Sequence, residues 1–157
     1  MTDYVRRAEK RDISEILELL VQVNLVHHLG RPDLFKNATK YNAAELEAII
    51  ADENTPVFVC VSPDGKVRGH AFCIFKQVTG SALLTDVKTL YIDDICVDES
   101  ARGRGVGRKL YQHVLDFARQ QGCYNITLNV WTCNPGAQKF YESMGMVPQK
   151  IGMEMIL

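Results

Sequence analysis

The chain has 157 residues, of which 46% are hydrophobic and 24% charged, and its formal net charge at pH 7 is -1. These values indicate one globular domain, 1–157, with enough apolar residues for a core, and they disfavour a nucleic-acid binder that depends on an overall basic surface. We find neither a secretory signal nor an apolar run of the roughly 18 residues that cross a bilayer, so we expect no membrane contact and a cytoplasmic location.

The first half of the chain predicts a strand, two helices and a hairpin. Residues 2–8 form a short strand pattern, and the apolar residues after Asp12 recur with the helical period of 3.6, so Asp12 is expected to cap a helix. The polar segment 27–42, interrupted by Gly and Pro, predicts a surface loop before a short helix over 43–50. Apolar runs on both sides of the turn sequence PDGK, within 55–75, predict an antiparallel hairpin.

The second half predicts two strand-and-helix units and a closing strand. A long, mostly apolar strand pattern over 83–97 is followed by an amphipathic helix over 106–122. A strand over 124–131 precedes a helix over 135–145, and 147–157 predicts a last strand. The order β-α-α-β-β-β-α-β-α-β indicates a single α/β domain, with a mixed, largely antiparallel sheet of six to seven strands flanked by about four helices.

Metal and disulfide chemistry are not predicted. The five cysteines are odd in number, lie mostly in apolar runs and show no spacing suited to zinc. The four histidines have no partner at metal-ligand spacing. We therefore expect reduced, packed thiols and no bound metal.

Three arginines and three glycines stand within seven residues, Arg102–Arg108, between a predicted strand and a predicted helix. A Gly-rich turn that opens a helix offers unpaired backbone N–H groups and the positive end of the helix dipole, which suit a phosphate. The dinucleotide pattern G-x-G-x-x-G fails because Arg108 stands three positions after Gly105, and the P-loop fails because no Gly-Lys-Ser/Thr follows. The pattern that fits is R-x-x-G-x-G, made by Arg102, Gly103, Arg104, Gly105, Val106 and Gly107.

This pattern, after a strand ending in Ile-Cys-Val, resembles the pyrophosphate-binding motif of the GNAT acetyltransferases. The opening V-R-R-A-x-x-x-D-I-x-x-I is similar to the first strand and helix of that superfamily, and NVWTCNPGAQKFYESMGM is similar to its fifth strand and the helix that follows. Order, length and spacing agree over nearly the whole chain, with 27–45 the least diagnostic part. The resemblance implies an N-acetyltransferase that uses acetyl-CoA as its acyl donor.

The resemblance also implies how acetyl-CoA would be held. Amides of the Gly-rich turn would cradle its pyrophosphate while the arginines add charge at the rim. The main chain of the strand before the turn would pair with the pantetheine arm, and the Ile95 N–H would face the thioester carbonyl. Asn134 would contact the pantetheine arm or the general acid, although an Asn before Pro is also an ordinary helix cap. The implied cofactor-binding residues are Ile95, Val97, Arg102, Gly103, Arg104, Gly105, Gly107, Arg108 and Asn134.

Acetyl transfer requires a neutral amine, yet an alkyl amine with a pKa of about 10.4 is neutral in only about one molecule in 2500 at pH 7. The sequence YIDDICV places Asp93 and Asp94 in an otherwise apolar strand, as candidate bases. Adjacent strand residues face opposite ways unless a bulge intervenes, so at least one is expected to face the site. For either residue alone, a surface ion pair is the alternative. Diamine acetyltransferases carry an acidic pair in this register, which implies a base or a cation anchor.

The leaving thiolate has a pKa near 8.5, so a phenol with a pKa of about 10 can return a proton to it. Tyr141 lies two turns into the helix that follows Asn134, where many members of the superfamily place their general acid. The alternative for Tyr141 is a packed aromatic residue. Direct transfer needs no nucleophilic cysteine, so Cys96 is expected to pack in the core.

The acceptor stays open. Segments 27–45 and 76–88 are expected to shape its pocket, and a small primary amine, such as a polyamine, amino acid or aminoglycoside, is favoured over a peptide. Asn129 stands where ribosomal-protein N-terminal acetyltransferases carry a Glu base, which disfavours a protein N-terminus as acceptor. The alternatives are a catalytically silent CoA-binding module and an enzyme for peptide or protein amines. Homodimerisation is frequent in the superfamily and is left open.

Overall fold

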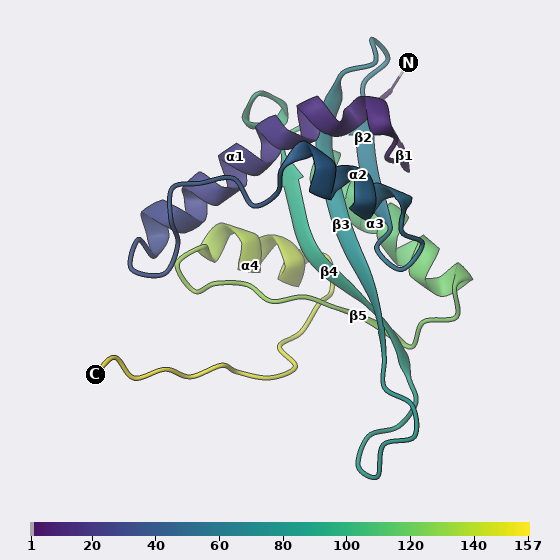
Figure 1. Ribbon diagram of the computed structural model, residues 1–157, viewed down its shortest axis with the longest axis vertical. Coiled ribbons are helices and arrows are strands. Elements are labelled where there is room, and N and C mark those ends of the chain that lie inside the picture. The colour runs from purple at the N-terminus through teal and green to yellow at the C-terminus, as the bar shows by residue number, and fades with distance from the viewer. Residues whose placement is uncertain (1) are drawn as a thin grey trace.

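The structure of the chain is a computed structural model that describes residues 2–157 (Figure 1). Among the helices of these residues, none combines the length and the hydropathy that a membrane span requires. Two short 3-10 turns, Lys10–Asp12 and Glu99–Ala101, precede α1 and α3. The main elements are, in order, β1 (Tyr4–Arg7), α1 (Ile13–Gly30), α2 (Ala43–Ala51), β2 (Val57–Val61), β3 (Val67–Gln77), β4 (Lys88–Val97), α3 (Val106–Gln120), β5 (Asn125–Thr127) and α4 (Pro135–Ser143).

The strands form one mixed sheet in the order β1-β2-β3-β4-β5. Neighbouring strands from β1 to β4 pair antiparallel, whereas β5 pairs parallel with β4. The predicted α/β class, the antiparallel hairpin and the four helices are therefore confirmed. The predicted count of six to seven strands is wrong, because residues 2–157 form five.

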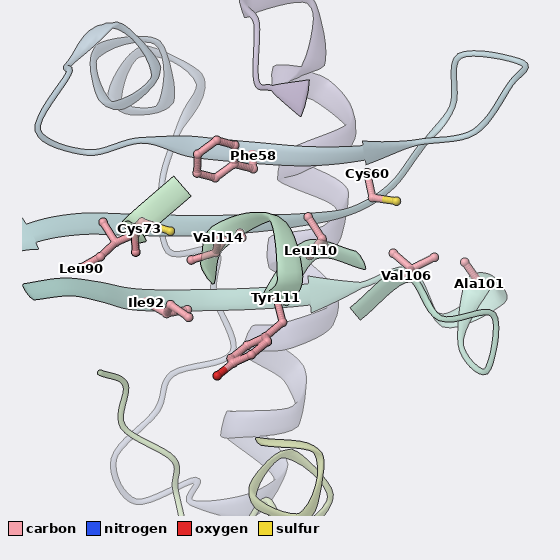
Figure 2. Close-up of a cluster of buried hydrophobic side chains, with 12 residues drawn as sticks. Phe58, Cys60, Cys73, Leu90, Ile92, Ala101, Val106, Leu110, Tyr111 and Val114 are labelled. Carbon is pink, nitrogen blue, oxygen red and sulfur yellow. The ribbon is translucent and has the colours of Figure 1, made fainter. Parts of the chain in front are cut away.

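Two hydrophobic cores lie on opposite faces of the sheet. α1 and α2 cover one face, where Ile16 and Leu46 are fully buried. α3 covers the other face, and Figure 2 shows Leu110 and Val114 of α3 beside Phe58 of β2. β2 is buried on both faces because its residues alternate between the two cores. Val57, Val59 and Val61 enter the first core, and Phe58 and Cys60 enter the second.

Three predicted segments differ from the structure. α1 continues through Gly30, so the start of the predicted loop 27–42 is helical. The strand predicted over 124–131 is paired only at Asn125–Thr127. The closing strand predicted over 147–157 is wrong: these residues form no helix or strand and make no backbone hydrogen bond within residues 2–157. A strand exists only where a ladder partner satisfies its backbone, and the alternating pattern alone does not supply that partner.

Asp12 stands at the start of α1 as predicted, but its side chain makes no cap hydrogen bond with that helix. It accepts hydrogen bonds from the Arg6 guanidinium at 2.8 Å and from the Glu9 N–H at 2.8 Å. Burial acts to raise the pKa of Asp12, but the hydrogen bonds from Arg6 and Glu9 outweigh it and lower that pKa. The buried carboxylate therefore joins β1 to the turn before α1.

We expect Asp12→Asn to lower the free energy of unfolding by about 3 kcal/mol at pH 7, because the Arg6 charge loses its buried partner. The folded pKa of Asp12 lies below the unfolded value near 3.9, so the carboxylate stabilises the fold above that value and this contribution is lost as the pH falls through the folded pKa. Urea unfolding at pH 7 and in acid measures both effects. A difference between wild type and variant that stays constant into acid would contradict the assignment.

Candidate active site

A bulge in β4 decides where the acidic pair points. In the β3–β4 ladder Phe72 pairs with Asp94 and Cys73 with Ile92, so Asp93 is an extra residue on β4. Such a bulge interrupts the alternation of side chains and re-aims those beside it. Asp93 contacts the loop between α1 and α2, and Asp94 lies opposite Phe72, which packs in the core beneath α1. Both carboxylates therefore lie on the α1 and α2 side of the sheet, where the sequence alone required only one.

Asp93 is held by Lys40, a residue that belongs to none of the motifs in the sequence. The Lys40 ammonium donates to Asp93 Oδ2 at 2.6 Å, across 53 positions in sequence. Burial acts to lower the pKa of Lys40, but the hydrogen bond to Asp93 outweighs it and raises that pKa. Lys40 belongs to the segment 27–45 that was predicted to shape the acceptor pocket. The ion pair shows that this segment reaches the acidic pair.

Asp94 is held by His70, a fully buried residue of β3. The His70 Nε2 lies 3.1 Å from Asp94 Oδ2, and the His70 ring packs 4.8 Å from the ring of Phe72. A carboxylate only accepts, so His70 donates through Nε2. Its buried Nδ1 has no partner among the described residues. Local sequence patterns do not reveal the pairing of His70 with Asp94, because it depends on the register of β3 and β4.

Tyr141 lies on α4 and packs against the hydrophobic core on the α3 face of the sheet. The centroid of its ring lies 5.2 Å from that of the Phe140 ring and 6.5 Å from that of the Tyr111 ring. Burial raises the pKa of the Tyr141 phenol above its ordinary value of 10, and the nearby negative charge of Asp94 acts in the same direction. Asn134 caps α4, accepting a hydrogen bond from the Ala137 N–H at 3.3 Å, as predicted. The fold thus brings Tyr141 within electrostatic range of Asp94.

β4 and β5 pair over only three residues and then separate. Their parallel ladder joins Thr89–Tyr91 to Asn125–Thr127. Beyond Tyr91, no strand of the described chain pairs with this edge of β4, which includes Ile95 and Val97. Backbone N–H and C=O groups along this edge are available to an extended ligand. The edge of β4 that the resemblance assigns to the pantetheine arm is therefore unpaired among the described residues.

The Gly-rich turn leaves the start of α3 open. Gly105 stands at the N-cap with φ 80°, in the left-handed region, and makes no side-chain cap hydrogen bond. By contrast, the Asn42 side chain caps α2 and the Asn134 side chain caps α4. The first N–H groups of α3 consequently have no intrahelical acceptor and point outward at the positive end of the helix dipole. This end of α3 can accept an anion.

Positive charge surrounds this open helix end. Arg102, Arg104 and Arg108 are exposed, and none forms an ion pair with any of residues 2–157. A Cβ added at Gly105 would meet nothing within 4 Å, so the space next to the turn is open. A Cβ added at Gly107 would instead lie 3.3 Å from the Phe140 ring, so this glycine also permits α3 to pack against α4.

The cysteines fit the prediction of packed thiols rather than a nucleophile. The Cys96 thiol is buried and donates to the Leu19 carbonyl at 3.3 Å, and burial raises its pKa to about 12. A thiol with so high a pKa is not a thiolate at neutral pH. All five cysteines are free. Among residues 2–157, no group of three or more metal-ligating side chains lies together.

Comparison with known sequences decides the family. Residues 5–146 match the sequence profile of the Acetyltransferase (GNAT) family. The chain belongs to the GNAT family. It is therefore an N-acetyltransferase, and GNAT enzymes take the acyl group from acetyl-CoA.

Several known proteins align with most of the length of this GNAT chain. Over 150 residues it is 29% identical to glucosamine 6-phosphate N-acetyltransferase 1 of Oryza sativa subsp. japonica, covering 95% of this chain and 84% of that protein. Over 135 residues it is 27% identical to thialysine N-epsilon-acetyltransferase of Bos taurus, covering 86% and 72%. Among solved structures, a mutant of the BH1408 protein of Bacillus halodurans is 31% identical and superposes with a TM-score of 0.94 over 98% of both chains.

Proposed function

We propose that this GNAT enzyme acetylates a primary amine of a small molecule, and that the amine attacks acetyl-CoA directly in a ternary complex. The observation that carries the proposal is the β4 bulge, which brings both carboxylates of the acidic pair to one face of the sheet. Two relatives are named for glucosamine 6-phosphate and thialysine, which are small amines, and this supports the substrate class.

In this proposal Asp94 removes the proton from the acceptor ammonium. His70 donates to Asp94 through Nε2 and so fixes the orientation of the carboxylate. Asp93, already paired with Lys40, anchors the acceptor beside the base. Tyr141 returns a proton to the departing thiolate, and its raised pKa keeps the phenol protonated throughout the physiological range.

The residues present fit acetyl-CoA, which supplies an acetyl group activated as a thioester. The uncapped start of α3 and the three unpaired arginines suit a pyrophosphate, and the free edge of β4 suits an extended amide-containing arm. We assign the pyrophosphate to Arg102, Gly103, Arg104, Gly105, Gly107 and Arg108. We assign the pantetheine arm to the main chain of Ile95 and Val97, with Asn134 at its end.

The function is tested by thiol release from acetyl-CoA in the presence of polyamines, amino acids, amino sugars, aminoglycosides and short peptides. Turnover with one class of small amine is the expected result. Turnover with peptides alone would replace the small-molecule assignment. Binding of CoA without turnover on any acceptor would favour a CoA-binding module that has lost catalysis.

The pyrophosphate assignment predicts that Gly105→Glu weakens CoA binding at least tenfold. The introduced carboxylate would repel the pyrophosphate, and any side chain is strained at the φ of 80° found at Gly105. Isothermal titration with CoA measures the affinity, and thermal unfolding measures the strain.

The matched control is Gly65→Glu in the turn between β2 and β3. Gly65 also has a positive φ, 86°, and open space around it, so the backbone strain is similar. Its turn lies at the same end of the sheet but opens no helix, and the Gly65 N–H donates to the Ser62 carbonyl at 2.8 Å. We expect Gly65→Glu to bind CoA like the wild type. Equal CoA affinity in both variants would refute the role of the turn.

A further inference from the structure

A primary ammonium of the chain itself lies at the acidic pair. The Lys40 ammonium donates to Asp93 Oδ2 at 2.6 Å, and both side chains are partly exposed, so a small molecule can reach the pair. Burial acts to lower the pKa of Lys40, but the hydrogen bond to Asp93 outweighs it and raises that pKa, so the ammonium is charged at neutral pH. Lys40 thus neutralises one of the two carboxylates that the proposed acceptor would meet.

The residues directly after Lys40 hold its side chain in this position. The Lys40 ammonium lies 5.3 Å from the centroid of the Tyr41 ring, within the range of a cation–π contact. The centroid of the Tyr41 ring lies 5.9 Å from that of Phe72 on β3. Asn42 then caps α2 through its side chain. The contacts of Tyr41 and Asn42 fix the end of the loop to the sheet and to α2, so Lys40 stays beside the acidic pair.

The charges at the acidic pair leave a single net negative charge. Asp93 and Asp94 carry one negative charge each, and Lys40 carries one positive charge. His70, the partner of Asp94, is fully buried, and its Nδ1 has no partner among the described residues. A proton on Nδ1 would add a buried, unsatisfied donor, so we count His70 as neutral. One incoming ammonium therefore balances the site, and a second ammonium does not.

We infer that Lys40 determines the charge of the acceptor, which is an amine with one ammonium group and a neutral or anionic remainder, such as an amino acid or an amino sugar. The inference rests on the proposed function and narrows its substrate class. The acidic pair by itself would suit a dication, and the charge of Lys40 removes that match. An ammonium has three donors, of which Asp93 uses one, so Lys40 can also donate to a carboxylate, phosphate or hydroxyl oxygen of the acceptor.

The test compares three acceptors that share a five-carbon chain and differ at its far end. Pentylamine carries a methyl group there, 5-aminopentanoate a carboxylate and 1,5-diaminopentane a second ammonium. Thiol release from acetyl-CoA gives kcat/KM for each acceptor, and titration calorimetry on the CoA-loaded protein gives each Kd. Like charges within about 10 Å, at an effective dielectric constant of about 20, weaken binding about tenfold. For the wild type we therefore expect the diamine to be at least about tenfold poorer than the other two acceptors in both measurements.

Three variants separate the charge of Lys40 from its packing. Lys40→Gln removes the charge, and we expect the ratio of kcat/KM for the diamine to kcat/KM for pentylamine to rise at least about tenfold. Lys40→Arg keeps the charge and should keep the wild-type ratio. Lys36→Gln is the matched control, because Lys36 is an exposed lysine of the same loop that forms no ion pair with any of residues 2–157. Its ratio should equal that of the wild type.

The outcomes distinguish the role of Lys40 from the proposed function. A wild type that acetylates the diamine as well as pentylamine, or a Lys40→Gln variant with the wild-type ratio, would overturn the inference, while acetyl transfer to small amines would stand. The expected order of Kd values without any acetyl transfer would support the inference and refute the proposed function. Neither binding nor transfer with any of the three acceptors would overturn the inference, and the acceptor panel would then test the proposed function alone.

Discussion

Replacing Tyr141 with Phe is expected to lower kcat by roughly 10²–10³, within the range found for the loss of a general acid. The affinity for acetyl-CoA should hardly change, because the ring stays packed against Phe140 and only the proton donor is removed. Thiol release with the acceptor identified from the panel measures kcat and KM separately. A loss confined to KM would mean that the phenol binds substrate and does not take part in proton transfer.

Tyr111→Phe provides the matched control for this variant. Tyr111 is a buried tyrosine whose ring lies 6.5 Å from that of Tyr141, so the same hydroxyl group is deleted from a neighbouring ring. We expect Tyr111→Phe to retain nearly full activity. Equal activity of Tyr141→Phe and Tyr111→Phe would leave Tyr141 as a packing residue.

Burial raises the pKa of Tyr141, so loss of its proton should not limit wild-type activity until the pH exceeds 10.

Asp94→Asn is expected to lower kcat/KM at pH 7 by roughly 10²–10³, because the acceptor ammonium loses the group that takes its proton. The Asn side chain has nearly the same shape and can still accept the hydrogen bond from His70 Nε2. Asp93→Asn should cost less, about tenfold and mainly in KM, because Asp93 is already neutralised by Lys40. The reverse order of the two losses would exchange the roles of base and anchor.

The pH profile of Asp94→Asn separates a base from a binding residue. The neutral fraction of an alkyl amine with a pKa of about 10.4 rises about tenfold for each pH unit between 7 and 9. The variant depends on amine that is already neutral, so its kcat/KM should rise by up to about tenfold per pH unit over this range. The wild type should rise less steeply because it has its own base. Parallel profiles would show that Asp94 does not accept the proton.

Local patterns in the sequence were enough to predict much of this protein. Hydrophobic periods and turn residues located the hairpin, the four helices and the Asn134 cap, because these features depend on residues within a few positions of one another. The Arg and Gly pattern at 102–108 predicted an open helix start for the same reason. The odd number of cysteines and their apolar neighbours in sequence predicted packed thiols, and Cys96 is a packed thiol.

The tertiary structure decided the parts that depend on distant partners. The pairing register places the bulge at Asp93, and it brings His70 to Asp94 from 24 positions away. The approach of the loop before α2 brings Lys40 to Asp93. Segment 147–157 also shows that a local pattern does not suffice, because its apolar residues alternate and yet it is not a strand. A period-two pattern determines that a strand can form, but a strand forms only where a second backbone satisfies its hydrogen bonds.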